Sequence, residues 1–133
     1  MKRTVRNVRA RKEVAPAIPN CREDIILPTE FTVTETGDNF LMFDSGPIPN
    51  RILIFSTTSN INLLAMSQHW YADGTFKVVP PLFEQLYTIH GLQDNVAVPL
   101  IYALLPNKTE ETYLTLLREI KNYFLLLLHN QKQ

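Results

Sequence analysis

The second half of the chain predicts an α/β fold in which three antiparallel strands are followed by a helix. Three segments are rich in the β-branched and aromatic residues typical of strands: residues 69–79, 83–91 and 96–105. Turn-forming residues separate them, at Pro80-Pro81 and at Gln93-Asp94-Asn95. After the third strand, apolar residues recur at intervals of three or four up to Leu128, which is the spacing of an amphipathic helix.

Length and composition favour a single folded domain. The chain has 133 residues, of which 45% are hydrophobic and 20% charged, as in ordinary globular proteins. The single cysteine, Cys21, excludes an internal disulfide and a multi-cysteine zinc site. The longest apolar run, Tyr123 to Leu128, is far shorter than the roughly 20 residues that cross a bilayer, and the N-terminus does not have the pattern of a secretory signal. We therefore expect an intracellular protein that is not secreted and has no membrane partner.

Residues 1–28 are expected to form a basic, proline-containing arm. Its first basic residues all precede the first acid of the chain: Lys2, Arg3, Arg6, Arg9, Arg11 and Lys12. Removing these six from the thirteen basic residues leaves seven against thirteen acids, so the rest of the chain has a formal charge of −6. Such an arm is either a solubilising tail or a contact for DNA phosphates or the nuclear import machinery.

Residues 29–68 are expected to hold a small β-hairpin, a strand and a helix. The hairpin would pair residues 31–33 with 39–43 across a Gly-Asp turn. The strand is expected at residues 51–55, and a hydroxyl side chain at 57–59 would cap the helix that follows.

Two residues are unusual for the strands that hold them. Pro99 has no N–H to donate to a ladder, so we expect the strand at residues 96–105 to lie at an edge of the sheet. Asp73 lies within the first strand, although Asp is depleted in strands because its short polar side chain competes for backbone hydrogen bonds. A strand that carries such an acid either exposes it or uses it, so Asp73 is the candidate site residue.

The C-terminal helix is predicted to begin with a polar cap and to expose part of its apolar surface. Asn107 or Thr109 is the expected N-cap, and two glutamates follow in the first turn, where negative charge suits the helix dipole. Four consecutive leucines, Leu125 to Leu128, place apolar side chains all around the helix, so some of them should face solvent.

Other side chains are expected to have structural roles. His90 should be half-buried in its strand, and Cys21 should be an inert thiol. Four aromatic residues are expected in the core: Trp70, Phe76, Tyr87 and Tyr102.

Several segments of the chain resemble the Mutator-like element (MULE) transposases. The resemblance extends from about Asp24 to Lys121. Its most specific part is Trp70-Tyr71-Ala72-Asp73-Gly74-Thr75-Phe76 followed by Lys108-Thr109-Glu110-Glu111-Thr112-Tyr113. Further matching segments are Asn39-Phe40-Leu41 with Asp44-Ser45-Gly46, Arg51-Ile52-Leu53-Ile54-Phe55-Ser56-Thr57, Leu82-Phe83-Glu84-Gln85-Leu86-Tyr87-Thr88-Ile89-His90 and Val98-Pro99-Leu100-Ile101-Tyr102-Ala103-Leu104-Leu105.

The resemblance implies a ribonuclease-H-like core, in which three acids hold two Mg²⁺ or Mn²⁺ ions for DNA strand cleavage and transfer. Asp73 matches the first of these acids and is thus the implied catalytic and metal-binding residue. Residues 69–133 would form the first half of this core, preceded by the family-specific segment at 29–68. The second and third acids would lie beyond Gln133, so we expect a truncated domain that is inactive by itself and does not hold the metal tightly.

Neither of two other acids is expected to replace the missing ones. If Pro80-Pro81 turns a hairpin, Glu84 would face Lys77 and lie about 13 Å from Asp73, which is too far to share a metal ion. Asp44 belongs to a turn outside the core.

Two alternatives to an inactive remnant remain open. The chain is either a non-catalytic interaction or DNA-binding module derived from a transposon, or an active nuclease whose site is completed by a second copy. DNA is the expected partner through the basic arm, besides a second copy of the chain or a full-length transposase. The nucleus is the expected location, with the cytoplasm as the alternative.

Overall fold

The computed structural model of the chain describes residues 19–75 and 79–131. Within them lie five strands, two α-helices and two short 3-10 helices. In chain order these are η2 (Arg22–Asp24), η3 (Thr29–Phe31), β1 (Leu41–Asp44), β2 (Leu53–Phe55), α2 (Thr58–Met66), β3 (Trp70–Thr75), β4 (Gln85–Gln93), β5 (Val96–Leu105) and α3 (Glu110–Gln131).

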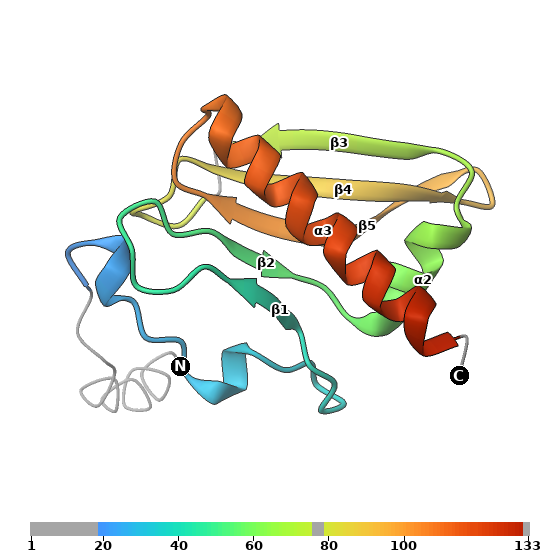
Figure 1. Cartoon of the computed structure of the whole chain (residues 1–133), viewed down its shortest axis with the longest axis horizontal. Coiled ribbons are helices and arrows are strands. Elements are labelled where there is room, and N and C mark those ends of the chain that lie inside the picture. The colour runs from blue at the N-terminus through green and yellow to red at the C-terminus, as the bar shows by residue number, and fades with distance from the viewer. Residues whose placement is uncertain (1–18, 76–78, 132–133) are drawn as a thin grey trace, which may run out of the picture.

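The five strands form one antiparallel sheet in the order β1-β2-β5-β4-β3 (Figure 1). The expected meander of three strands followed by a helix is therefore present as β3, β4, β5 and α3. The preceding segment does not stand apart from it, because β2 pairs with β5 and β1 continues the sheet beyond β2. The result is a mixed α/β fold with one continuous sheet.

The expectation that the proline-containing strand lies at the sheet edge is wrong, because β5 is paired on both sides. The proline is tolerated for a local reason. β2 is short and pairs only with Tyr102 to Leu104 of β5, so its ladder ends before Pro99. On the other side, the register with β4 shifts between Ile89 and His90, where the proline lies at a β-bulge.

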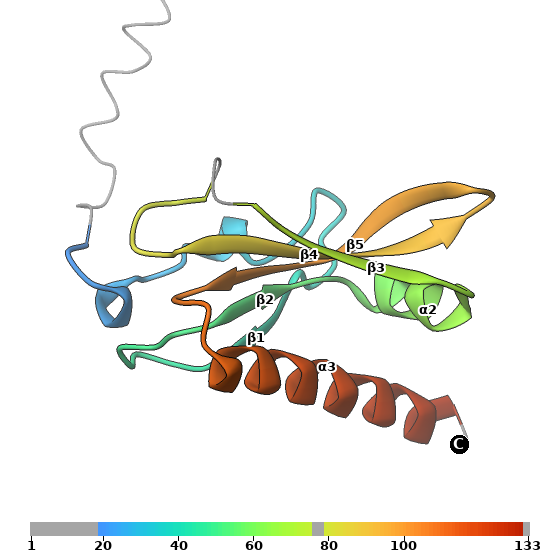
Figure 2. The same ribbon diagram turned by 90° about the horizontal axis from the view of Figure 1, so that it is seen from above.

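Helix α3 covers one face of the sheet and α2 packs at one end of it (Figure 2). The bulge in β5 contributes to the core, because two consecutive residues, Leu100 and Ile101, are both buried there. None of the helices in the described part of the chain has the length and apolarity needed to cross a bilayer. The buried hydrophobic cluster consists of Ile52, Ile54, Ile61, Leu64, Ile89, Leu100, Ile101, Ala103, Leu105, Leu116 and Ile120.

The predicted turn and helix caps are confirmed. Asp94 and Asn95 join β4 to β5 with φ angles of 50° and 67°, the left-handed pair that a two-residue hairpin of type I′ requires. The Thr57 hydroxyl caps α2 by accepting from the backbone N–H three residues on, at 3.0 Å. The Thr109 hydroxyl does the same for α3, at 3.3 Å.

The predicted N-terminal hairpin is reduced to a single bridge between Val33 and Asn39. Residues up to Phe31 form the 3-10 turn η3 instead of a strand. The Thr32 hydroxyl donates to the Thr29 carbonyl at 2.8 Å, a local bond that competes with ladder formation.

Candidate functional site

Asp73 lies in β3, the edge strand of the sheet. β4 pairs with one side of β3, with Asp73 opposite Thr88. Within the described residues, no strand pairs with the other side of β3. The first four residues of β3, including Asp73, are exposed. The backbone N–H and C=O groups of the outer side can therefore accept a further strand.

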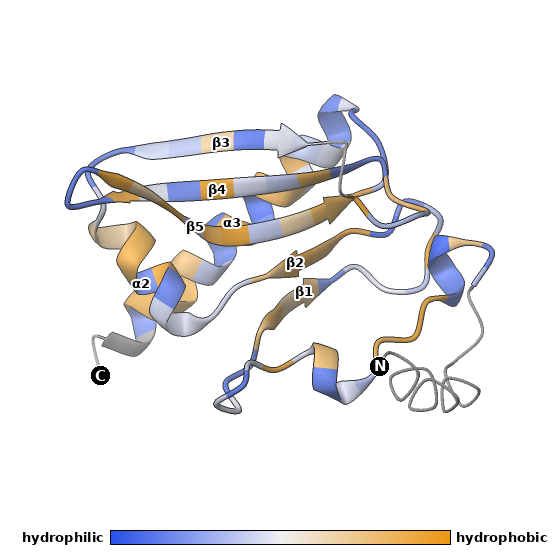
Figure 3. Cartoon of the chain, turned by 180° about the vertical axis from the view of Figure 1, so that it is seen from behind, coloured by the Kyte–Doolittle hydropathy of each residue, from blue (hydrophilic) through white to orange (hydrophobic). Residues whose placement is uncertain are grey.

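The side chain of Asp73 belongs to the face of the sheet opposite α3. Residues directly opposite each other in an antiparallel ladder share a face, so Asp73, Thr88, Tyr102 and Phe55 form one row across four strands. The ring of Phe40 extends this row, with its centroid 5.4 Å from Phe55 and 6.2 Å from Tyr102. Figure 3 shows that no helix covers this face. The row thus runs from aromatic rings at the centre to a carboxylate at the open edge.

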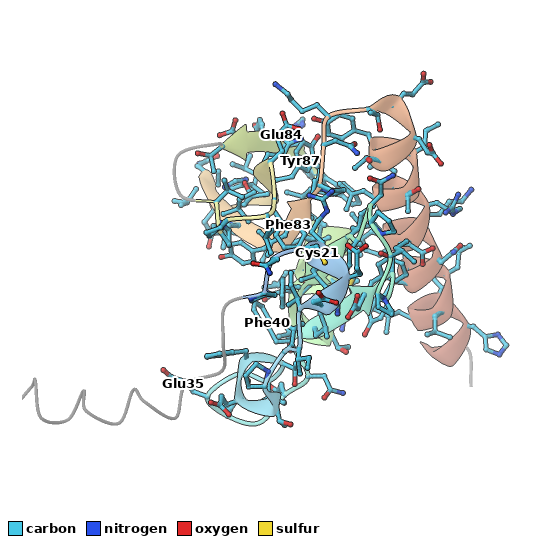
Figure 4. The ribbon with its side chains drawn as sticks, turned by 90° about the vertical axis from the view of Figure 1, so that its left-hand side faces the viewer. Cys21, Glu35, Phe40, Phe83, Glu84 and Tyr87 are labelled. Atoms are coloured by element: carbon cyan, nitrogen blue, oxygen red, sulfur yellow. The ribbon has the colours of Figure 1, made fainter. Side chains whose placement is uncertain are left out.

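The side chains that the structure describes do not form a site for a pair of divalent metal ions. A pair of metal ions requires several carboxylates at close range. Across residues 19–75 and 79–131, no three His, Cys, Asp or Glu side chains are grouped so that they could hold a metal ion. Glu84, labelled in Figure 4, is the other acid considered for this site, and its Oε2 is 3.9 Å from Lys108 Nζ. Asp73 therefore belongs to no group of three possible metal ligands among the described residues. Lys77, the residue expected to face Glu84, lies outside the described residues.

A buried glutamine supports β3 next to Asp73. Gln85 is 2% exposed, and its Nε2 donates to the Tyr113 hydroxyl of α3 at 2.6 Å. A Cβ atom at Gly74 would lie 2.5 Å from Gln85 Oε1. The absence of a side chain at Gly74 therefore leaves room for the buried amide beneath β3. The Tyr113 ring packs against that of Tyr87 in a tilted arrangement, with ring centroids 5.6 Å apart. These contacts join α3 to β4, the strand that pairs with β3.

Asp44 and Arg51 form a largely buried ion pair that the sequence interpretation did not include. Arg51 is 6% exposed, and its Nε and Nη2 donate to the two carboxylate oxygens of Asp44 at 2.9 and 2.7 Å. Its Nη1 donates to the carbonyls of Arg22 and Ile25 at 2.9 and 2.8 Å. Chiefly through its hydrogen bonds from Arg51, the pKa of Asp44 is lowered, and that of Arg51 is raised by the same contact. The only indication of this ion pair in the sequence is an acid and an arginine on either side of a Gly-Pro turn.

The segment before the sheet is anchored by a second arginine. Arg22 donates from Nε to the Pro49 carbonyl and from Nη1 to the Leu82 carbonyl, both at 2.6 Å. Leu82 has a φ of 82°, a conformation that is costly for a leucine. Arg22 and Arg51 therefore connect residues near positions 25, 49 and 82 into one unit, which gives both side chains a structural role.

An apolar groove of about 750 Å³ lies between α2 and the C-terminal half of α3. Met66 and Trp70, which are 75% and 47% exposed, contribute to one wall. Phe124 and Leu128 of α3 contribute to the other, and Asn62 is the one amide in the lining. The groove offers burial to an apolar group but no charged side chain for catalysis.

The remaining predicted residues have mixed outcomes. Trp70 is not a core residue: it starts the edge strand, stacks on Phe124 at 5.4 Å, and keeps about half of its surface exposed. Tyr102 is half-buried on the face opposite α3, and His90 is half-buried as predicted. The pKa of Cys21 is raised, above all by its hydrogen bond to Asp24, which agrees with an inert thiol. Phe76 and the six basic residues from Lys2 to Lys12 lie outside the described residues.

Comparison with protein-family models, with curated proteins and with solved structures finds no match for this chain. The sheet, its edge strand β3 and the position of Asp73 are the features that bear on function.

Proposed function

We propose that the chain is the first half of a ribonuclease-H-like transposase core of the MULE type and that it is catalytically inactive by itself. Three features support this proposal. An antiparallel meander, β3-β4-β5, is followed by α3 on one face of the sheet. Asp73 lies on the first strand of that meander. The additional strands β1 and β2 extend the sheet from β5 and leave the edge beside Asp73 open.

The observation that carries the proposal is the position of Asp73 on an edge strand. A strand added to β3 would bring a side chain to about 5 Å from Asp73, since that is the Cβ separation of directly opposite residues. An acid on that strand would thus become a close neighbour of Asp73. Among the described residues there is no such acid, which is why we expect no activity from this chain alone.

Complementation tests the proposal. The purified chain is mixed with the missing half-core of a complete MULE transposase, and Mg²⁺-dependent nicking of supercoiled DNA is measured. We expect nicking only in the mixture and its loss with Asp73→Asn. Glu84→Gln removes an exposed acid at a distant position and is the matched control that should leave nicking intact. Nicking by the chain alone, or nicking in the mixture that survives Asp73→Asn, would refute the proposal.

A second candidate is a non-catalytic interaction module derived from a transposon, favoured by the exposed start of β3 and by its position at the edge of the sheet that the described strands form. It predicts that the chain captures a complete transposase in a pull-down without any nicking in the mixture.

The proposed DNA contact of the basic arm, and with it nuclear localisation, has its own test. If all six charges contact phosphates, log affinity should fall with log salt at a slope of roughly −5, whereas a slope near zero would assign the arm to solubility.

A further inference from the structure

We draw no further inference here: the strongest candidate, the apolar groove between α2 and the C-terminal half of α3 that Trp70 and Phe124 help to line, carries none, because its lining has no charged side chain to select a ligand and nothing in the structure shows what covers it.

Discussion

The ion pair between Arg51 and Asp44 gives the most direct test of how the segment before the meander is held. Arg51→Met keeps the apolar stem but removes the guanidinium, which leaves the Asp44 carboxylate and the carbonyls of Arg22 and Ile25 without four hydrogen bonds of 2.7 to 2.9 Å. Breaking a fully buried pair costs about 3–5 kcal/mol. The Asp44 side chain is 25% exposed, so water offsets part of this cost. We therefore expect Arg51→Met to lower the free energy of unfolding by about 2–4 kcal/mol. Domains have only about 5–15 kcal/mol of stability in total.

Urea unfolding at pH 7 measures this loss, and a double-mutant cycle with Asp44→Asn isolates the pair. The two single substitutions should not be additive, with a coupling free energy of about 1–2 kcal/mol. The pKa of Asp44 is lowered in the folded state by Arg51. As the pH falls to about 4, the Asp44 carboxylate therefore takes up a proton in the unfolded chain before it does so in the folded chain. Stability from this pair is therefore present above that pH and is lost as the pH falls through the folded-state pKa. Additive single effects, or a loss below about 1 kcal/mol for Arg51→Met, would refute the interpretation.

Substitutions at four other positions test other parts of the structure. Gly91→Ala should destabilise the chain by about 2–3 kcal/mol in urea unfolding, because the new Cβ meets a serine hydroxyl at 2.5 Å and a leucine methyl at 3.0 Å. Gly74→Ala should lower the free energy of unfolding by less, about 1–2 kcal/mol, since only the end of a glutamine side chain is closer than 3 Å. A larger loss for Gly74→Ala than for Gly91→Ala would contradict the local packing. Thr57→Ala should lower the free energy of unfolding by about 1 kcal/mol, because it removes the cap of α2. Thr57→Ser keeps the hydroxyl and should not lower it. Asp24→Ala should lower the pKa of Cys21 and speed its alkylation by iodoacetamide at pH 8, because the carboxylate bonded to the thiol is gone; an unchanged rate would mean that this bond does not form in solution.

Local signals predicted the regular elements well. Asp94 and Asn95 tolerate left-handed backbone, so they define the β4–β5 turn whatever surrounds it. The periodicity of α3 and the hydroxyl cap of Thr109 are likewise properties of consecutive residues. The position of β5 was not predictable in this way. Whether Pro99 excludes a neighbouring strand depends on how far β2 reaches along β5, and β2 comes from a distant part of the sequence.

The same distinction applies to the candidate site. The composition of its strand was enough to identify Asp73 as either exposed or functional, and it is exposed. The contact between Arg51 and Asp44 depends on the shape of the turn between two strands, which residue types alone do not define. Trp70 was misassigned to the core because its size suggests burial, whereas its place at the start of an edge strand leaves one side open to solvent.

Titration calorimetry of the purified chain with Mn²⁺ is the most direct test of the central claim that it supplies Asp73 but no complete metal site. We predict no stoichiometric uptake in the micromolar range, and the same result for Asp73→Asn. Tight binding of one or two ions per chain that disappears with Asp73→Asn would contradict it.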